Sequence, residues 1–224
     1  MKKVLIFAFV VMVAGTAFGM GDLYVSGTWR YRMTVEIETP EEIKTGSAVH
    51  ELSNANSSVE IMSFPEAGNP PTFKGEAVAV DMGARGVVFA ILPTDPYYMF
   101  FYTFYPALAG ATTVEGIKFF NSLPSGLKKD LPPKHYPPFV MFKDMDDPKT
   151  VTAVDTTKFA ETFGEGVRFK SITLEITDEK VTWGIINKYL SDNFWDRFRA
   201  WMQSIDIYER GPYVGLFNFK AGEP

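Results

Sequence analysis

An unbroken alternation of apolar and polar residues near the start of the chain constrains the fold more than any other feature. It runs from Trp29 to Glu38. Successive side chains of a β-strand point to opposite faces, so this stretch predicts a strand with one buried face and one exposed face. The residues expected on the buried face are Trp29, Tyr31, Met33, Val35 and Ile37.

Further strands are expected at short intervals along the chain. Residues 44–52 resume extended structure after a proline-containing break, which predicts a hairpin with the first strand, and the polar stretch 53–57 is expected to be a turn. Residues 76–82 and 87–92 predict a second hairpin, and the wholly apolar second half is expected to be a central strand buried on both faces. Other strands are expected at 59–62, 139–142, 150–154, 167–176 and 213–219.

Helices are expected between these strands. Apolar residues at helical spacing, together with capping residues, predict helices over 107–123, 156–163, 177–190 and 191–204. The strongly aromatic stretch 97–105 is too short to span a membrane and is expected to fill the core. Together these elements predict an α+β fold, with a mostly antiparallel sheet (sandwich-like or half-barrel) and three or four helices packed on it.

The first residues have the order of a bacterial secretory signal peptide. A basic start at Lys2 and Lys3 precedes an apolar run of eleven residues, and small residues follow it. Residues 1–19 are therefore predicted to be removed, with cleavage after Gly19 or, as the second choice, after Ala17. An uncleaved anchor is the alternative, but a spanning helix needs about 20 apolar residues. Residues 20–224 are expected to form a single exported domain, periplasmic or extracellular, with no stable membrane span.

The composition excludes several classes of site. The chain has no cysteine, so it has no disulfide, no thiolate metal site, no cysteine nucleophile and no lipid-modified cysteine. Its formal net charge is -5, which argues against a nucleic-acid partner held by a broad basic surface. An exported domain of this composition must be stabilised by its core alone.

A small acidic cluster is the candidate metal site. Asp144, Asp146 and Asp147 supply carboxylate oxygens, which are the ligands that Ca²⁺ and Mg²⁺ prefer. The glycine and the distal glutamate of a calcium-binding loop are absent from this segment. The commoner alternative is a turn at Asp147–Pro148, in which aspartate side chains accept hydrogen bonds from nearby backbone amides.

The sequence contains no assembled catalytic motif. Its two histidines are His50, beside Glu51 on an expected strand, and His135, in the proline-rich strap 131–138. Neighbours on a strand face opposite sides, so His50 and Glu51 cannot form a base and its orienting partner. There is no G-x-S-x-G elbow and no H-E-x-x-H zinc motif, and the G-x-G at 164–166 lies after an expected helix rather than before one. We therefore predict no catalytic residue and no cofactor.

Three residues are candidates for contact with a partner or ligand. Arg30 and Arg32 share the polar face of the first strand and are suited to an anionic ligand, although cross-strand salt bridges are the more common use. Trp183 falls off the apolar stripe of the helix expected at 177–190 and is a candidate anchor for an interaction. The aromatic residues of 191–204 are expected mainly in the core, with a sugar- or peptide-binding surface as the alternative.

Three segments carry a resemblance to a known family. They read F-x-D-x-x-D-P at 142–148, T-F-G-x-G-V-R at 162–168 and E-I-T-D at 175–178. On these residues the chain resembles an uncharacterised family of small bacterial exported proteins, and its earlier blocks follow the same order. That family has no assigned activity, so the resemblance implies a shared fold and no particular chemistry.

These observations leave three functions open. The favoured one is a non-enzymatic exported domain that binds an envelope protein or a small ligand. The second is a metal-assisted envelope hydrolase that uses the cluster Asp144, Asp146 and Asp147. The third is a periplasmic inhibitor or immunity-type protein, for which an acidic surface would suit a basic target.

Overall fold

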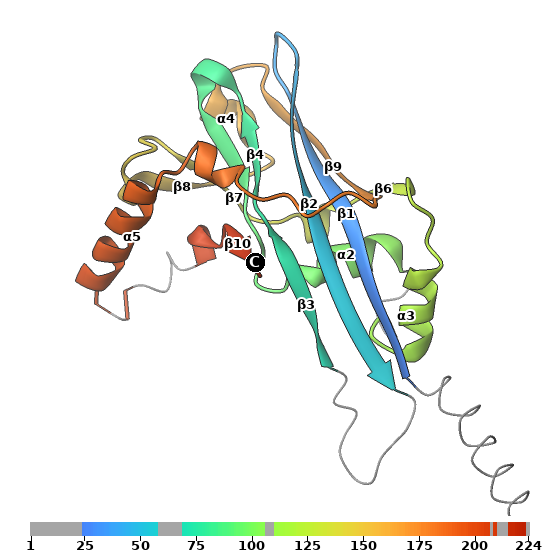
Figure 1. Cartoon of the computed structure of the whole chain (residues 1–224). Coiled ribbons are helices and arrows are strands. Elements are labelled where there is room, and N and C mark those ends of the chain that lie inside the picture. The colour runs from blue at the N-terminus through green and yellow to red at the C-terminus, as the bar shows by residue number, and fades with distance from the viewer. Residues whose placement is uncertain (1–23, 58–68, 106–109, 207, 210–214, 223–224) are drawn as a thin grey trace, which may run out of the picture.

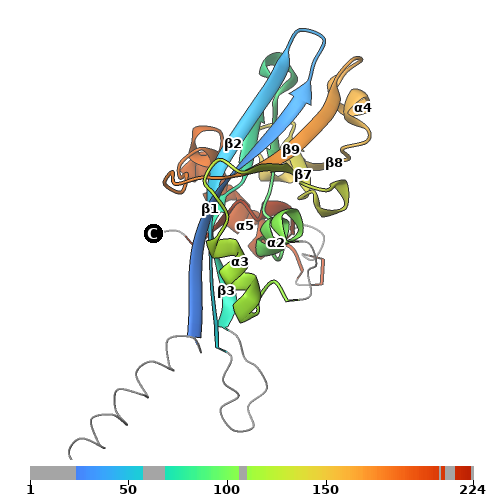
Figure 2. The ribbon, with the colours of Figure 1, turned by 90° about the vertical axis from the view of Figure 1, so that its right-hand side faces the viewer.

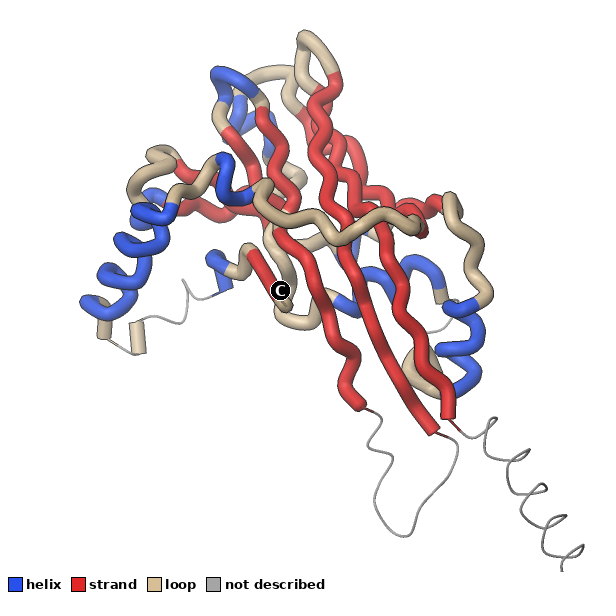
Figure 3. The backbone as a smooth tube through the Cα atoms, viewed as in Figure 1, coloured by secondary structure: helices blue, strands red, loops and turns tan. Residues whose placement is uncertain are grey.

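The computed structural model describes residues 24–57, 69–105, 110–206, 208–209 and 215–222 (Figure 1). These residues form two antiparallel sheets and four α-helices, which confirms the predicted α+β class (Figure 3). One sheet has six strands in the order β10-β3-β2-β1-β9-β6, and the other has four in the order β4-β5-β7-β8. The predicted signal peptide, residues 1–19, lies outside the described residues, as does the strand expected at 59–62. In the described part of the chain, no helix combines the length and the hydrophobicity needed to cross a membrane.

The strands are short except for the first three and the ninth. Their bounds are β1 (Tyr24–Glu38), β2 (Ile43–Ser57), β3 (Asn69–Glu76), β4 (Val78–Asp81), β5 (Val87–Ala90), β6 (Lys128–Asp130), β7 (Phe139–Phe142), β8 (Val151–Val154), β9 (Arg168–Ile176) and β10 (Lys220–Ala221).

The helices lie mostly in the second half of the chain. The α-helices are α2 (Tyr97–Phe104), α3 (Val114–Asn121), α4 (Phe159–Phe163) and α5 (Asp192–Ser204). The 3-10 turns are η1 (Gly83–Arg85), η2 (Pro133–His135), η3 (Pro148–Thr150), η4 (Ile186–Lys188) and η5 (Gly215–Phe217).

The hairpin of β1 and β2 is the frame of the larger sheet. Trp29 lies opposite Leu52 in its register, and the five residues expected on the buried face of β1 are all buried. The turn expected at 53–57 is wrong, because β2 continues through it to pair Ser57 with Tyr24. A polar stretch stays extended here because β1 supplies hydrogen-bonding partners along its whole length.

Strand β5 of the smaller sheet is buried on both faces. Residues of β4 and β5 pair as the predicted second hairpin, and β5 lies between β4 and β7. Val88 and Ala90 face the core shared with β1, whereas Phe89 and Ile91 face a second core closed by α5 and Phe219. The layers are therefore the larger sheet, the smaller sheet and then the C-terminal elements. The prediction that the apolar stretch 87–92 forms a strand buried on both faces is confirmed.

The aromatic stretch fills the first core as expected. Met99, Phe100, Phe101 and Phe104 of α2 are all buried, and Phe100 stacks against Trp29 of β1. Figure 2 shows α2 and α3 together on one side of the long strands. This packing accounts for much of the unusual aromatic content of the chain.

The helix expected at 177–190 is wrong. Only η4 is helical in that stretch, and the residues before it run as an extended strap beside β2. The amide of Thr182 donates to the carbonyl of Val49, and the amide of Val49 donates to the Thr182 hydroxyl. Strand β3 pairs with β2 only at residues 51–55, so it does not reach Val49. The strap lies along this edge of β2 instead and supplies hydrogen-bonding partners for the backbone of Val49.

A glycine permits the two sheets to cross closely. A Cβ atom built on Gly46 of β2 would lie 2.1 Å from the carbonyl oxygen of Ala79 in β4, a distance that no side chain tolerates. Close by in the chain, the amide of Ala77 donates to the carbonyl of Phe219, which ties the C-terminal stretch to the point where the chain passes from β3 into β4. The strand expected at 213–219 is wrong in its described part, where η5 replaces it and β10 follows.

Candidate functional site

The acidic cluster forms a hydrogen-bonded turn. The Asp144 carboxylate accepts from the amide of Asp146. The Asp147 carboxylate caps η3 by accepting from the amide of Lys149. The backbone carbonyl of Asp146 accepts from Arg197 of α5 at 2.8 Å. In the described ranges no three histidine or acidic side chains gather in a group that would hold a metal ion. The geometry is that of the turn alternative, in which the carboxylates serve the backbone.

Arg30 and Arg32 form salt bridges on the outer face of the larger sheet. Arg30 contacts Glu51, its partner across the hairpin, at 2.8 Å, and Lys74 of β3 contacts the same carboxylate at 3.2 Å. Arg32 pairs with Glu179 of the strap. Both guanidinium groups are therefore engaged by carboxylates, which is the common use of such side chains on a sheet face.

Trp183 lies in the strap rather than on a helix. It is half-buried, and both of its neighbours are held by hydrogen bonds. The Thr182 hydroxyl accepts from the amide of Val49, and the amide of Gly184 donates to the Glu76 carboxylate. These bonds set the position of its backbone. Its role as an interaction anchor stays a prediction.

A buried polar group holds the strap in place. Glu76, at the end of β3, is fully buried, and its two carboxylate oxygens accept from the amides of Ile185 at 2.6 Å and Gly184 at 3.1 Å. The carbonyl of Glu76 contacts Nε2 of His50 at 2.9 Å. A carbonyl only accepts, so Nε2 is the protonated nitrogen of the imidazole. Glu76 therefore ties the strap to β3 and, through its backbone, orients the imidazole of His50.

His50 is a core residue with a strongly altered acidity. Its imidazole is fully buried against Tyr31 and Phe73, at ring-centroid distances of 5.2 Å for each. Burial lowers the pKa of His50 to about 4, because a charged imidazolium would lose its hydration there. A Cβ atom on Gly75 would lie 2.4 Å from the imidazole, so this position of β3 requires glycine. A neutral, enclosed imidazole is a structural element rather than a base open to substrate.

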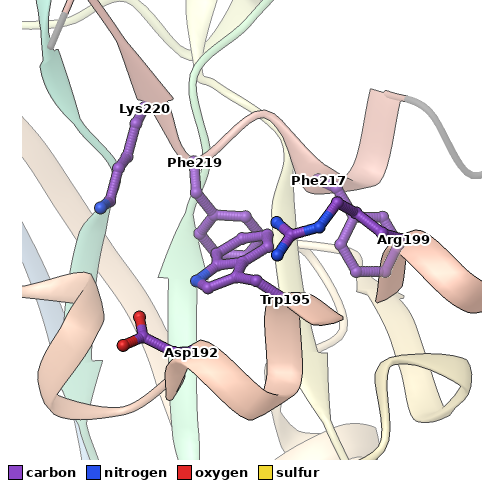
Figure 4. A pocket seen from close by; sticks show the side chains of 6 residues that line it. All are labelled: Asp192, Trp195, Arg199, Phe217, Phe219 and Lys220. Carbon is purple, nitrogen blue, oxygen red and sulfur yellow. The ribbon is translucent and has the colours of Figure 1, made fainter. Parts of the chain in front are cut away.

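The candidate binding site is a pocket between α5 and the C-terminal stretch (Figure 4). It has a volume of about 390 Å³, within the range of pockets that hold small molecules. Asp192, Trp195 and Arg199 lie on one face of α5, since they are three and four residues apart. The remaining lining residues are Phe217, Phe219 and Lys220.

Aromatic rings form the wall of this pocket. The half-buried indole of Trp195 meets the ring of Phe219 at 5.7 Å and an interplanar angle of 72°, and Phe219 itself is buried. Figure 4 shows the Trp195 ring between the charged side chains. A half-exposed indole held edge-on by a buried phenyl ring is a rigid apolar surface for a planar ligand.

The rim of the pocket carries charges of both signs. Arg199 and Lys220 supply two cations, and Asp192 supplies one carboxylate. Arg199 pairs with Asp196, and the Lys220 ammonium donates to the side-chain oxygen of Asn187 at 3.0 Å, so each cation is positioned by a polar neighbour. The lining therefore holds two cations and one carboxylate, and Asp196, which pairs with Arg199, adds a second carboxylate beside it.

Sequence reasoning missed most of this pocket. It expected the aromatic residues of α5 in the core, but only Phe194 is buried, whereas Trp195, Phe198 and Trp201 are half-buried. The spacing of Asp192, Trp195 and Arg199 was visible as one helical face. Their partners from the C-terminal stretch were not, because the pairing of Ala77 with Phe219 that places them is a tertiary contact.

Comparison with known proteins finds no relative of this chain. The chain has no significant match among protein-family models, among curated proteins or among solved structures.

Proposed function

We propose that this protein is an exported, non-enzymatic binding protein, and that its pocket between α5 and β10 takes a small ligand with a planar apolar face and an anionic group. One observation carries the proposal: a pocket of about 390 Å³ combines the Trp195 wall with the cations of Arg199 and Lys220. The indole suits the planar face, and the two cations suit an anion. Export is supported by the signal-peptide pattern of residues 1–19.

Export is tested by the mass of the mature protein. Expressed with its full sequence in a secreting bacterial host, the chain is expected to appear outside the cytoplasm without its first 19 residues, and intact-mass spectrometry will read the cleavage site directly. A mass that matches residues 18–224 would identify cleavage after Ala17. A full-length product retained in the cells would contradict export.

The ligand chemistry is tested with a matched pair of probes. Titration with 2-naphthoate is expected to shift the indole N–H signal of Trp195 in ¹H–¹⁵N NMR spectra, whereas neutral 2-naphthamide shifts it at least tenfold less at equal concentration, because the amide has no charge for the cations. The sequence has only four tryptophans, so Trp195→Phe assigns the signal.

Substitutions in the pocket define the site. Trp195→Ala and Arg199→Gln are each expected to weaken 2-naphthoate binding about tenfold or more, the first by removing the wall and the second by removing a cation. Trp201→Ala is the matched control, because it removes an indole from the same helix outside this pocket. Equal binding of acid and amide, or equal loss in the control, would contradict the proposed ligand class.

A further inference from the structure

The outer side of α2 presents tyrosines where a helix of this kind usually presents charged residues. The core takes Met99, Phe100, Phe101 and Phe104. Tyr98 and Tyr102, four residues apart, remain on the outer side, and Tyr98 is 37% exposed. Tyrosine has lower helix propensity than lysine or glutamate and leaves aromatic surface in water, so folding alone does not explain this choice.

These tyrosines line a second pocket, which shares no lining residue with the α5–β10 pocket. Its volume is about 330 Å³, and its lining includes Asp95, Tyr98, Tyr102, Lys134, His135 and Tyr136. The proline-rich strap supplies the opposite wall, where the His135 ring stacks on the Tyr102 ring at 3.5 Å and 7°. That stack fixes the Tyr102 ring, while Tyr98 stands one turn away at 5.7 Å and 33°. The pocket therefore has a pre-formed aromatic wall of two rings.

The polar groups of this second pocket call for a ligand with both donors and acceptors. Asp95 only accepts, Lys134 only donates, and tyrosine hydroxyls do both. The Tyr97 hydroxyl donates to the Asp95 carboxylate at 3.1 Å and thereby orients it. Burial and the nearby Lys134 lower the pKa of His135, so its imidazole is uncharged at neutral pH. The charges of Asp95 and Lys134 oppose one another and favour a ligand without net charge.

From this lining we infer a second binding site, specific for a neutral saccharide. A sugar ring has a face of C–H groups that packs against the negative face of an aromatic ring, and its hydroxyls both donate and accept. It would therefore satisfy Asp95 and Lys134 together while lying on Tyr98. A proline-rich peptide, the other ligand common in tyrosine-lined grooves, offers mainly carbonyl acceptors, so it would give the Asp95 carboxylate no donor beyond the Tyr97 hydroxyl.

The test measures saccharide binding to the mature protein. The probes are cellotetraose, maltotetraose and chitotetraose, examined by saturation-transfer NMR and isothermal titration calorimetry, with a polyproline peptide as the rival ligand. At least one saccharide is expected to bind, and Tyr98→Ala and Asp95→Asn are each expected to weaken it tenfold or more. Tyr24→Ala is the matched control, because Tyr24 is an exposed tyrosine on β1 that lies outside the pocket lining. It is expected to leave the affinity unchanged.

Several outcomes would overturn the inference. They are the failure of all three saccharides to bind, binding of the polyproline peptide alone, and saccharide affinity that Tyr98→Ala and Asp95→Asn leave intact while their circular dichroism stays native. Trp195→Ala is expected to keep full saccharide binding. The outcome at this site is therefore independent of the ligand proposed for the α5–β10 pocket.

Discussion

Acidification from pH 7.5 to pH 5 is expected to lower the free energy of unfolding by about 2 kcal/mol through His50 alone. The folded protein binds a proton on His50 only near pH 4, because the imidazole is enclosed in the core, whereas the unfolded chain binds it near the ordinary value of 6.5. Between these two pH values the unfolded state holds more protons, so stability falls as the pH falls. Above pH 6.5 this group has no further effect, and by pH 4 the loss reaches about 3 kcal/mol.

Urea unfolding at pH 7.5, 6.5, 5.5 and 5.0 measures this effect in a window above the ordinary pKa range of carboxylates. His50→Gln is expected to be less stable at every pH but to lose most of the slope. His135→Gln is the matched control, since it removes the other histidine, which is only half-buried in the proline-rich strap 131–138. It is expected to retain most of the slope, since burial lowers the pKa of His135 as well. A slope that survives in His50→Gln would show that the buried imidazole does not govern acid sensitivity.

Glu76→Ala is expected to lower the free energy of unfolding by about 3 to 6 kcal/mol at pH 7.5, because it removes two hydrogen bonds to a charged acceptor, each of which contributes about 1.5 to 3 kcal/mol. The substitution leaves the amides of Gly184 and Ile185 without their acceptor. It also releases the segment around Gly184 and Ile185 from β3. We therefore expect this segment to open locally, in addition to the loss of global stability. Urea unfolding measures the first effect, and hydrogen exchange of these two amides measures the second.

Glu76→Gln separates charge from geometry. The glutamine oxygen can still accept from one amide, and the side-chain volume is nearly the same, so its loss is expected to be about half that of Glu76→Ala. Glu38→Gln is the surface control, because the ion pair of Glu38 with Arg168 is exposed and its loss is expected to cost about 1 kcal/mol or less. Equal losses in Glu76→Ala and Glu38→Gln would contradict a structural role for the buried carboxylate.

The fold was predictable where local pattern and tertiary structure agree. The alternation of 29–38 identified both the strand and its buried face, and the apolar run 87–92 identified a central strand. The helix expected at 191–204 is α5, and the Ser191 side chain caps it by accepting from the amide of Phe194. In each case the signal lies within a few residues, so no distant contact is needed to interpret it.

The errors lie where a distant partner outweighs local preference. Residues 177–185 have helical spacing of apolar residues, but Val49 and Glu76 offer them hydrogen bonds that a helix would forgo. Residues 53–57 are polar and still form a strand, since β1 lies alongside. Propensities differ by less than 1 kcal/mol per residue, and two or three buried hydrogen bonds exceed that difference.

The sequence by itself determined the α+β class, the buried face of β1, the aromatic core filling of α2 and the absence of disulfides, because these follow from spacing and residue type along the chain. Only the tertiary structure decided where the pockets lie. Trp195 meets Phe219 because the C-terminal stretch pairs with Ala77, and Tyr102 meets His135 because the proline-rich strap packs along α2. Both contacts join segments far apart in the chain, and such contacts depend on the packing of the whole core rather than on any local pattern.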